Sequence, residues 1–161
     1  VLQKGFKVRF RPHPENFKRS QKKIKNISDK FKNDAFILDD SQENKNAMEK
    51  AKCLITDNSG IAIEYILLFK RPVLYFEDVE KIHNKEFDRN TDLITIEDTV
   101  KKTFGFSFKK DEIKILDLII KKSIYQFKDR DKEIEVFLNK NFYNFNETIK
   151  KFENLMLKYF N

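Results

Sequence analysis

Short apolar segments alternate along this chain with longer segments in which apolar residues recur every three or four positions. The short segments are bounded by polar residues, as expected for parallel strands that helices cover on both faces. They lie at Lys7–Arg11, Ala35–Leu38, Cys53–Thr56, Val73–Phe76 and Leu93–Ile96. The longer segments have the period of amphipathic helices, so the pattern predicts an α/β chain.

The predicted helices lie between these strands. One spans 15–32, a second runs from an N-cap at Ser41 to Ala51, and a third covers Ile61–Phe69. The dipeptide Arg71-Pro72 ends the third helix, because proline cannot continue it. Alternating strands and helices predict a parallel, doubly wound sheet with helices on both faces.

Beyond about residue 105 the apolar pattern becomes purely helical. Apolar faces recur over 113–124, 134–138 and 149–159, with Gly105 and the charged run 128–132 at the joints. We therefore expect an α/β core over 1–105, followed by closing helices over 106–161 that pack on the same domain.

Length and composition allow one well-packed domain. The chain has 161 residues, of which 40% are apolar, and its 17 phenylalanines supply material for a core. No apolar stretch reaches the ~20 residues that span a bilayer. The single cysteine excludes an internal disulfide and fits a reducing cytosol. Because a strand follows soon after Val1, we expect a fragment of a longer protein.

The net charge of +7 raises the question of a polyanionic partner. Acidic residues interrupt most of the basic runs, and Lys, Asn, Ile and Phe are abundant together, which is typical of AT-rich codon usage. We therefore expect no nucleic-acid binding. A non-catalytic module that binds polyanions remains an alternative, and it requires lysines clustered on one face.

A polar turn follows the strand that begins at Cys53. It consists of Asp57, Asn58, Ser59 and Gly60, and a helix begins directly after it. A strand, a tight turn and a helix N-terminus together direct backbone N–H groups toward an anion, usually a phosphate. Ser59 can also cap the helix, and a plain helix cap would use the same residues.

Other candidate site residues follow the neighbouring strands. Arg11 and His13 flank Pro12, which stiffens the backbone, and both side chains can bind phosphate. His13 can also carry a proton or be merely structural. Asp78 follows the strand ending at Phe76, and Glu64 lies one turn after Gly60, where it can hold a ribose or simply face solvent. Residues that directly follow the strands of a parallel sheet lie together at the carboxyl edge of the sheet, where ligands bind.

The sequence lacks the residues that several other kinds of functional site require. Two histidines and one cysteine, far apart, predict no metal site. With three glycines there is no Walker loop or Gly-x-Gly-x-x-Gly fingerprint, and Asn58-Ser59-Gly60 lacks the first glycine of a nucleophile elbow.

The chain resembles the CDP-glycerol glycerophosphotransferases of the teichoic-acid primase and polymerase type. The similarity covers roughly residues 5 to 90 and rests on the ordered segments 11–14 (RPHP), 51–60 (AKCLITDNSG), 70–76 (KRPVLYF) and 78–81 (DVEK). The resemblance implies the C-terminal, Rossmann-like, nucleotide-binding half of a GT-B fold. The N-terminal half, with the acceptor site, would then lie outside this chain, and the fragment alone would be inactive.

Two positions depart from the family pattern. Asn58 stands where the family usually has tyrosine, and Gly60 stands where it usually has a second serine. With Glu64, this version also resembles UDP-N-acetylglucosamine 2-epimerases and related GT-B glycosyltransferases that use UDP-sugars. Both families share the fold, so these departures bear on the identity of the donor.

The resemblance implies transfer of glycerol phosphate, or a related polyol or sugar unit, from CDP-glycerol to a cell-surface polymer such as teichoic acid or capsule. The diphosphate would be bound by Arg11, His13, Asn58, Ser59 and Gly60, the ribose by Glu64, with Asp57 and Asp78 in support and His13 also catalytic. No metal or cofactor is expected beyond the nucleotide-linked donor. The acceptor would be a surface polymer or lipid-linked, and the full-length protein cytoplasmic or peripheral at the inner face of the bacterial membrane.

Overall fold

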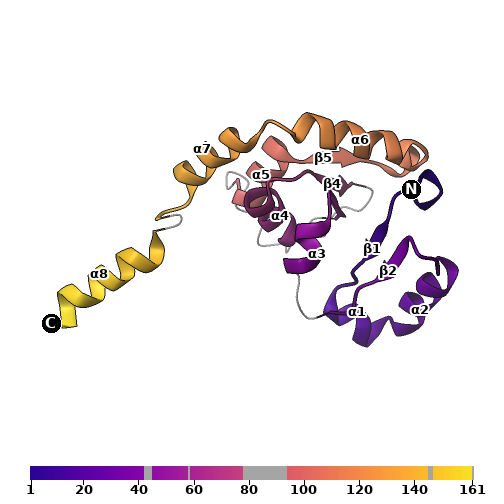
Figure 1. Cartoon of the computed structure of the whole chain (residues 1–161), viewed down its shortest axis with the longest axis horizontal. Helices are drawn as coiled ribbons and strands as arrows, with labels where there is room; N and C mark the ends of the chain where they lie inside the picture. The colour runs from indigo at the N-terminus through magenta and orange to yellow at the C-terminus, as the bar shows by residue number, and fades with distance from the viewer. Residues whose placement is uncertain (42–44, 58, 78–93, 145–146, 161) are drawn as a thin grey trace.

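The computed structural model describes residues 1–41, 45–57, 59–77, 94–144 and 147–160. Parallel strands are flanked by helices, which confirms the predicted α/β class (Figure 1). In chain order the elements are η1 (Leu2–Lys4), β1 (Val8–Phe10), α1 (Pro14–Arg19), α2 (Gln21–Lys30), β2 (Phe36–Leu38), α3 (Lys45–Lys50), β3 (Leu54–Thr56), α4 (Ile61–Phe69), β4 (Val73–Phe76), α5 (Ile96–Phe104), β5 (Phe106–Phe108), η3 (Lys110–Ile115), α6 (Leu116–Phe127), α7 (Asp131–Asn141) and α8 (Thr148–Phe160).

The strands divide into two parallel sheets. β1 pairs with β2, so that Phe10 stands opposite Leu38. The second sheet has the order β3-β4-β5, with Thr56 opposite Tyr75 and Phe76 opposite Phe108. Within the described residues no ladder joins one sheet to the other, whereas the sequence predicted a single sheet.

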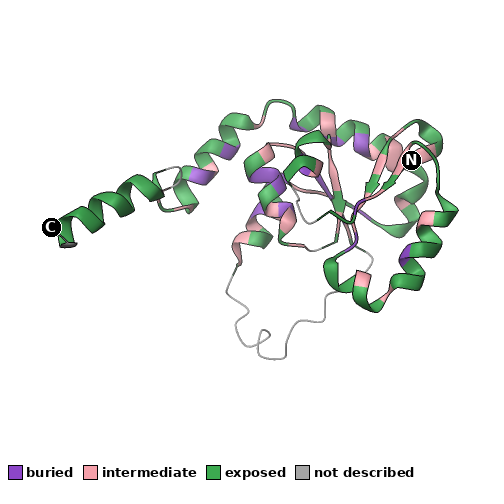
Figure 2. Cartoon of the chain, turned by 60° about the horizontal axis from the view of Figure 1, so that its bottom comes forward, coloured by how far each residue is buried: buried purple, intermediate pink, exposed green. Residues whose placement is uncertain are grey.

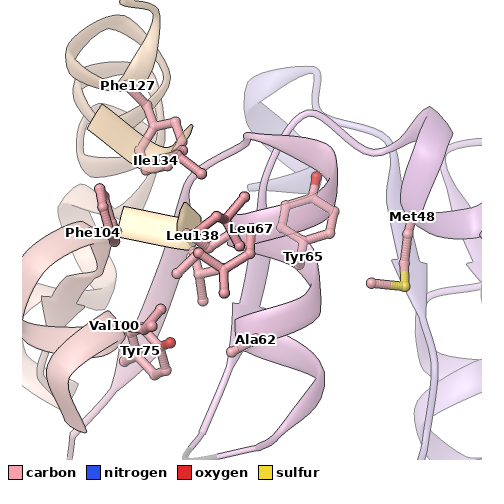
Figure 3. Packing of buried hydrophobic residues seen from close by; sticks show 12 residues of the cluster. Met48, Ala62, Tyr65, Leu67, Tyr75, Val100, Phe104, Phe127, Ile134 and Leu138 are labelled. Carbon is pink, nitrogen blue, oxygen red and sulfur yellow. The ribbon is translucent and has the colours of Figure 1, made fainter. Parts of the chain in front are cut away.

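Helices cover both faces of the three-stranded sheet. Val73 and Tyr75 of β4 point into a cluster built with α4, α5 and α7, whereas Leu74 points into a second cluster with β5 and α6. Figure 3 shows side chains of α4, α5 and α7 converging on the first cluster. Because successive side chains of a strand face opposite ways, burial of all three residues requires a layer of helices on each side.

Two predictions for the region 93–108 are wrong. The predicted strand at Leu93–Ile96 is not formed at its described residues, because Thr95 caps α5 and Ile96 begins it. The Thr95 hydroxyl accepts a hydrogen bond from the Asp98 amide at 3.1 Å. The last strand is instead β5, which lies in the region predicted to be purely helical. Phe106 and Phe108 pack on the sheet while Ser107 between them is exposed, which is the period of a half-buried strand.

The predicted helix over 15–32 is divided at Ser20, whose φ of −134° leaves the helical region. The helix Ile61–Phe69 is confirmed, and it ends at Lys70 in the left-handed conformation. The predicted cap at Ser41 stays a prediction, because residues 42–44 before α3 lie outside the described part of the chain; the Ser41 hydroxyl itself donates to Asp39.

The C-terminal helix α8 extends away from the body of the molecule (Figure 1). It is coloured as exposed along its length in Figure 2, and its apolar residues from Ile149 to Tyr159 are exposed. The apolar face that we expected to pack on the domain is therefore uncovered. Among the described residues, no helix combines the length and apolar content needed to cross a membrane.

Candidate functional site

Arg11 lies just beyond β1 and is held by groups that follow β2. Its Nη1 donates to Asp39 Oδ2 and to the Ser41 hydroxyl, both at 3.0 Å, and its Nη2 donates to the Ser41 carbonyl at 2.6 Å. The parallel register explains this contact, because Phe10 stands opposite Leu38 and the next pair is Arg11 and Asp39. Arg11 is thus fixed at the carboxyl edge of the sheet.

Asp39 is a buried carboxylate that the sequence analysis did not single out. Only 4% of it is exposed, and Arg9 also reaches it, at 3.3 Å. Burial by itself raises the pKa of Asp39, but hydrogen bonds from the Ser41 hydroxyl and amide and from Arg11 outweigh it. The pKa falls from its ordinary 3.8 to about 2. The strand register could have revealed this residue, since it places an acid directly beside Arg11.

His13 is exposed and caps the short helix α1. Its Nδ1 accepts a hydrogen bond from the Glu15 amide at 3.2 Å. An acceptor nitrogen carries a lone pair, so in the neutral ring the proton sits on Nε2. In this tautomer Nε2 is a hydrogen-bond donor, which suits contact with a phosphate oxygen better than removal of a proton.

The turn after β3 leads directly into α4. Gly60 is the N-cap, and α4 has no side-chain cap, so Ser59 does not cap this helix with its hydroxyl. The Ser59 and Gly60 carbonyls accept from the Ala62 and Ile63 amides, at 3.0 and 3.1 Å. A phosphate would therefore have to use the N–H groups of Gly60 and Ile61.

The backbone conformation at position 60 does not require a glycine. Its φ of −57° is accessible to any residue, and a Cβ atom built there would have no atom within 4 Å. The space in front of this turn is therefore open. The backbone at Gly60 is therefore accessible to a ligand, and the predicted role of this glycine in diphosphate binding stays a prediction.

The other predicted residues are less constrained. Asp57 is exposed, and its carbonyl accepts from the Ser59 amide at 3.0 Å. Glu64 lies in the first turn of α4 and is exposed, while the following Tyr65 is fully buried. Asn58 and Asp78 lie outside the described residues.

Next to Asp78, Glu77 links three elements. It accepts a hydrogen bond from the Ser107 hydroxyl of β5 at 2.7 Å and pairs with Lys101 of α5 at 3.0 Å. These contacts, the serine hydrogen bond first, hold the pKa of Glu77 below its usual range. Glu77 therefore connects the carboxyl end of β4 to β5 and to α5.

The loops at 11–14 and 57–60 follow strands of different sheets. Both loops stand at carboxyl ends of parallel strands, but their convergence on one pocket stays a prediction. Within the described residues no group of three His, Cys, Asp or Glu side chains could hold a metal ion.

The fold is an α/β architecture with parallel strands, the class in which ligands bind beyond the carboxyl ends of the strands. A family model described as CDP-Glycerol:Poly(glycerophosphate) glycerophosphotransferase matches residues 1–149, and the chain belongs to this family. It is accordingly a transferase of the glycerophosphotransferase kind. Neither the curated proteins nor the solved structures contain a match.

Proposed function

We propose that this chain is the donor-binding half of a transferase that moves glycerol phosphate from CDP-glycerol to a cell-surface polymer. The observation that carries the proposal is the family match over 1–149, which includes both strand-end loops. A second, acceptor-binding half upstream of Val1 would complete a GT-B enzyme.

In the proposed reaction an acceptor hydroxyl attacks the β-phosphorus of CDP-glycerol. A new P–O bond forms to the acceptor, the P–O bond to the α-phosphate breaks, and CMP leaves with the bonding electrons. The hydroxyl proton passes to a base or to solvent. Negative charge grows on the diphosphate, so hydrogen-bond donors at that position lower the barrier.

The donors that we assign to the diphosphate come from both loops. Arg11 provides a fixed positive charge, since Asp39 and Ser41 hold its guanidinium. His13 provides Nε2–H, because its Nδ1 is already an acceptor for Glu15. The Ser59 hydroxyl and the N–H groups of Gly60 and Ile61 complete the set.

The nucleoside would lie along α4. We assign Glu64 to the ribose hydroxyls, because it is exposed one turn beyond Gly60, on the helix that begins at the diphosphate. Asn58 would add a polar contact to the diphosphate, with Asp57 and Asp78 in support.

Isothermal calorimetry with the full-length protein tests this proposal. CDP-glycerol and CMP should bind more tightly than UDP and UDP-N-acetylglucosamine by about tenfold or more, because base recognition by paired polar groups discriminates strongly. A preference for uridine nucleotides would replace the proposal with a UDP-sugar glycosyltransferase or 2-epimerase. Binding of none of them, with tight salt-dependent binding of polyanions, would favour a non-catalytic module.

A further inference from the structure

A basic recess of about 330 Å³ lies at the amino edge of the three-stranded sheet. Its lining comes from the segment that joins α3 to β3, the segment that joins α4 to β4, and the C-terminal end of α6. The lining residues are Lys50, Lys52, Lys70, Arg71, Pro72, Ile124, Phe127 and Lys128. They include five cations and no carboxylate, and the volume is at the lower end of that typical for small-ligand sites.

Two of these cations already have partners. Lys70 pairs with Glu135 at 2.6 Å. Arg71 donates to the Glu49 carbonyl at 2.5 Å and also to the carbonyls of Met48 and Ala51, so it satisfies the C-terminal end of α3. These two side chains hold the wall of the recess in place.

The remaining three cations are exposed and unpaired in the part of the chain that the structure describes. They are Lys50, Lys52 and Lys128, and none has a carboxylate within ion-pair distance there. Lysines at helix C-termini can serve the helix dipole, but Arg71 already occupies the carbonyls at the end of α3. Three unpaired lysines around one recess therefore indicate an anion-binding site.

Three of the residues that line the recess, Pro72, Ile124 and Phe127, are apolar. Pro72 is buried and Phe127 is only 2% exposed, so neither presents an open ring on which a base could stack. Binders of single-stranded nucleic acid generally use exposed aromatic rings. A flat bilayer does not enter a recess, whereas a flexible chain of phosphodiesters with short carbon links does.

We propose that this recess binds a phosphodiester segment of a poly(glycerophosphate) chain, with Lys50, Lys52 and Lys128 on the phosphate. This assignment rests on the proposed function for the identity of the polymer. The recess lies at the amino ends of β3 and β4, whereas the donor loop at 57–60 lies at the carboxyl end of β3. The three residues of β3, roughly 10 Å of extended chain, separate the two. A polymer held here would be bound away from its reacting end.

A charge-matched pair of variants tests the assignment in the full-length protein. The recess variant carries Lys50→Gln, Lys52→Gln and Lys128→Gln. The control carries Lys102→Gln, Lys114→Gln and Lys121→Gln, which are exposed lysines outside the recess, so both variants lose the same charge. The probe is a short synthetic oligomer of glycerol phosphate, measured by fluorescence anisotropy at about 0.15 M salt. Affinity for CDP-glycerol is measured in parallel.

We expect the recess variant to bind the oligomer about tenfold more weakly than the wild type, and the control to change by less than about twofold. CDP-glycerol affinity should be the same in all three proteins. Equal losses in both variants would overturn the assignment, as would equally tight binding of phosphatidylglycerol vesicles or of a single-stranded oligonucleotide. If the oligomer binds as expected but CDP-glycerol does not bind at all, the result supports the assignment of the recess and contradicts CDP-glycerol as the donor.

Discussion

Arg11 and Asp39 face each other at the carboxyl ends of β1 and β2, with 3.0 Å between Nη1 and Oδ2. Arg9 shares the same carboxylate, so that two arginines lie against one aspartate in the described part of the chain. The carboxylate fixes the guanidinium in space. Such an arginine is oriented before a ligand arrives, which lowers the entropic cost of binding an anion.

Asp39→Asn should destabilise the fold. This change removes the negative charge and replaces one of the two acceptor oxygens with an NH2 group, which cannot accept from Arg11 or Ser41, and we expect a loss of about 2 kcal/mol in the free energy of unfolding. Urea denaturation at pH 7 measures it. The control is the exposed neighbour Asp40→Asn, which should change stability by less than about 0.5 kcal/mol.

The same pair predicts a pH dependence. Because folding lowers the pKa of Asp39 from 3.8 to about 2, its contribution is complete above the ordinary value and is lost as the pH falls toward 2. The stability difference between wild type and Asp39→Asn should therefore be constant near neutrality and shrink between pH 4 and pH 2. A difference that stays constant over this range would contradict the assignment.

His13 has two separable roles, and two substitutions distinguish them. His13→Ala removes the cap of α1 and should cost about 1 kcal/mol of stability, whereas His13→Asn retains a capping oxygen and should cost less. Neither variant has a donor that reaches as far as Nε2, so both should lose transfer activity. Full activity in His13→Asn would show that this residue only caps the helix.

The glycines Gly60 and Gly105 should respond to alanine in opposite ways. At Gly105 a Cβ would come within 2.6 Å of both the Lys101 carbonyl and the Tyr75 ring, so Gly105→Ala should cost about 1–3 kcal/mol. At Gly60 the space is open, and Gly60→Ala should change stability by less than about 0.5 kcal/mol. If a diphosphate approaches this backbone, Gly60→Ala should weaken CDP-glycerol binding by about tenfold. If Gly60→Ala binds CDP-glycerol as tightly as the wild type, close approach of the diphosphate does not explain the glycine at this position.

Ser59→Ala should reduce transfer without affecting the fold. The hydroxyl does not cap α4, so unfolding should be unchanged within about 0.5 kcal/mol. A lost hydrogen bond to a charged phosphate corresponds to a decrease in kcat/KM of about 10- to 100-fold. Ser28→Ala on α2 is the control and should keep wild-type turnover. Wild-type turnover in Ser59→Ala would exclude the hydroxyl from the site.

The strands β1 to β4 could be predicted from sequence because each is a short apolar run between polar residues. The structure of the region 93–108 could not be predicted, because the spacing of Ile94 and Ile96 is typical of a strand although Thr95 between them caps a helix. β5 has only three residues, and its alternation of Phe106, Ser107 and Phe108 is too short to be distinguished from a helix by period alone. The division into 1–105 and 106–161 stays a prediction.

Sequence patterns identified the candidate side chains but not their partners. Arg11 and His13 were predicted to be ligand-binding groups, yet the structure gives each an intramolecular contact as well. The pairing of Arg11 with Asp39 depends on the register of β1 against β2, which brings together residues 28 positions apart. The basic recess likewise combines three segments that are not adjacent in the sequence.

The sequence by itself determined the α/β class, the polar turns that follow β1 and β3, and membership of the glycerophosphotransferase family. Those features depend on local periodicity and on motifs of a few consecutive residues. Only the tertiary structure decided that Asp39 fixes Arg11, that Gly60 faces open space, and that lysines from α3 and α6 meet at one recess. Such relationships arise from strand register and from helix packing, which act between residues that the chain order keeps apart.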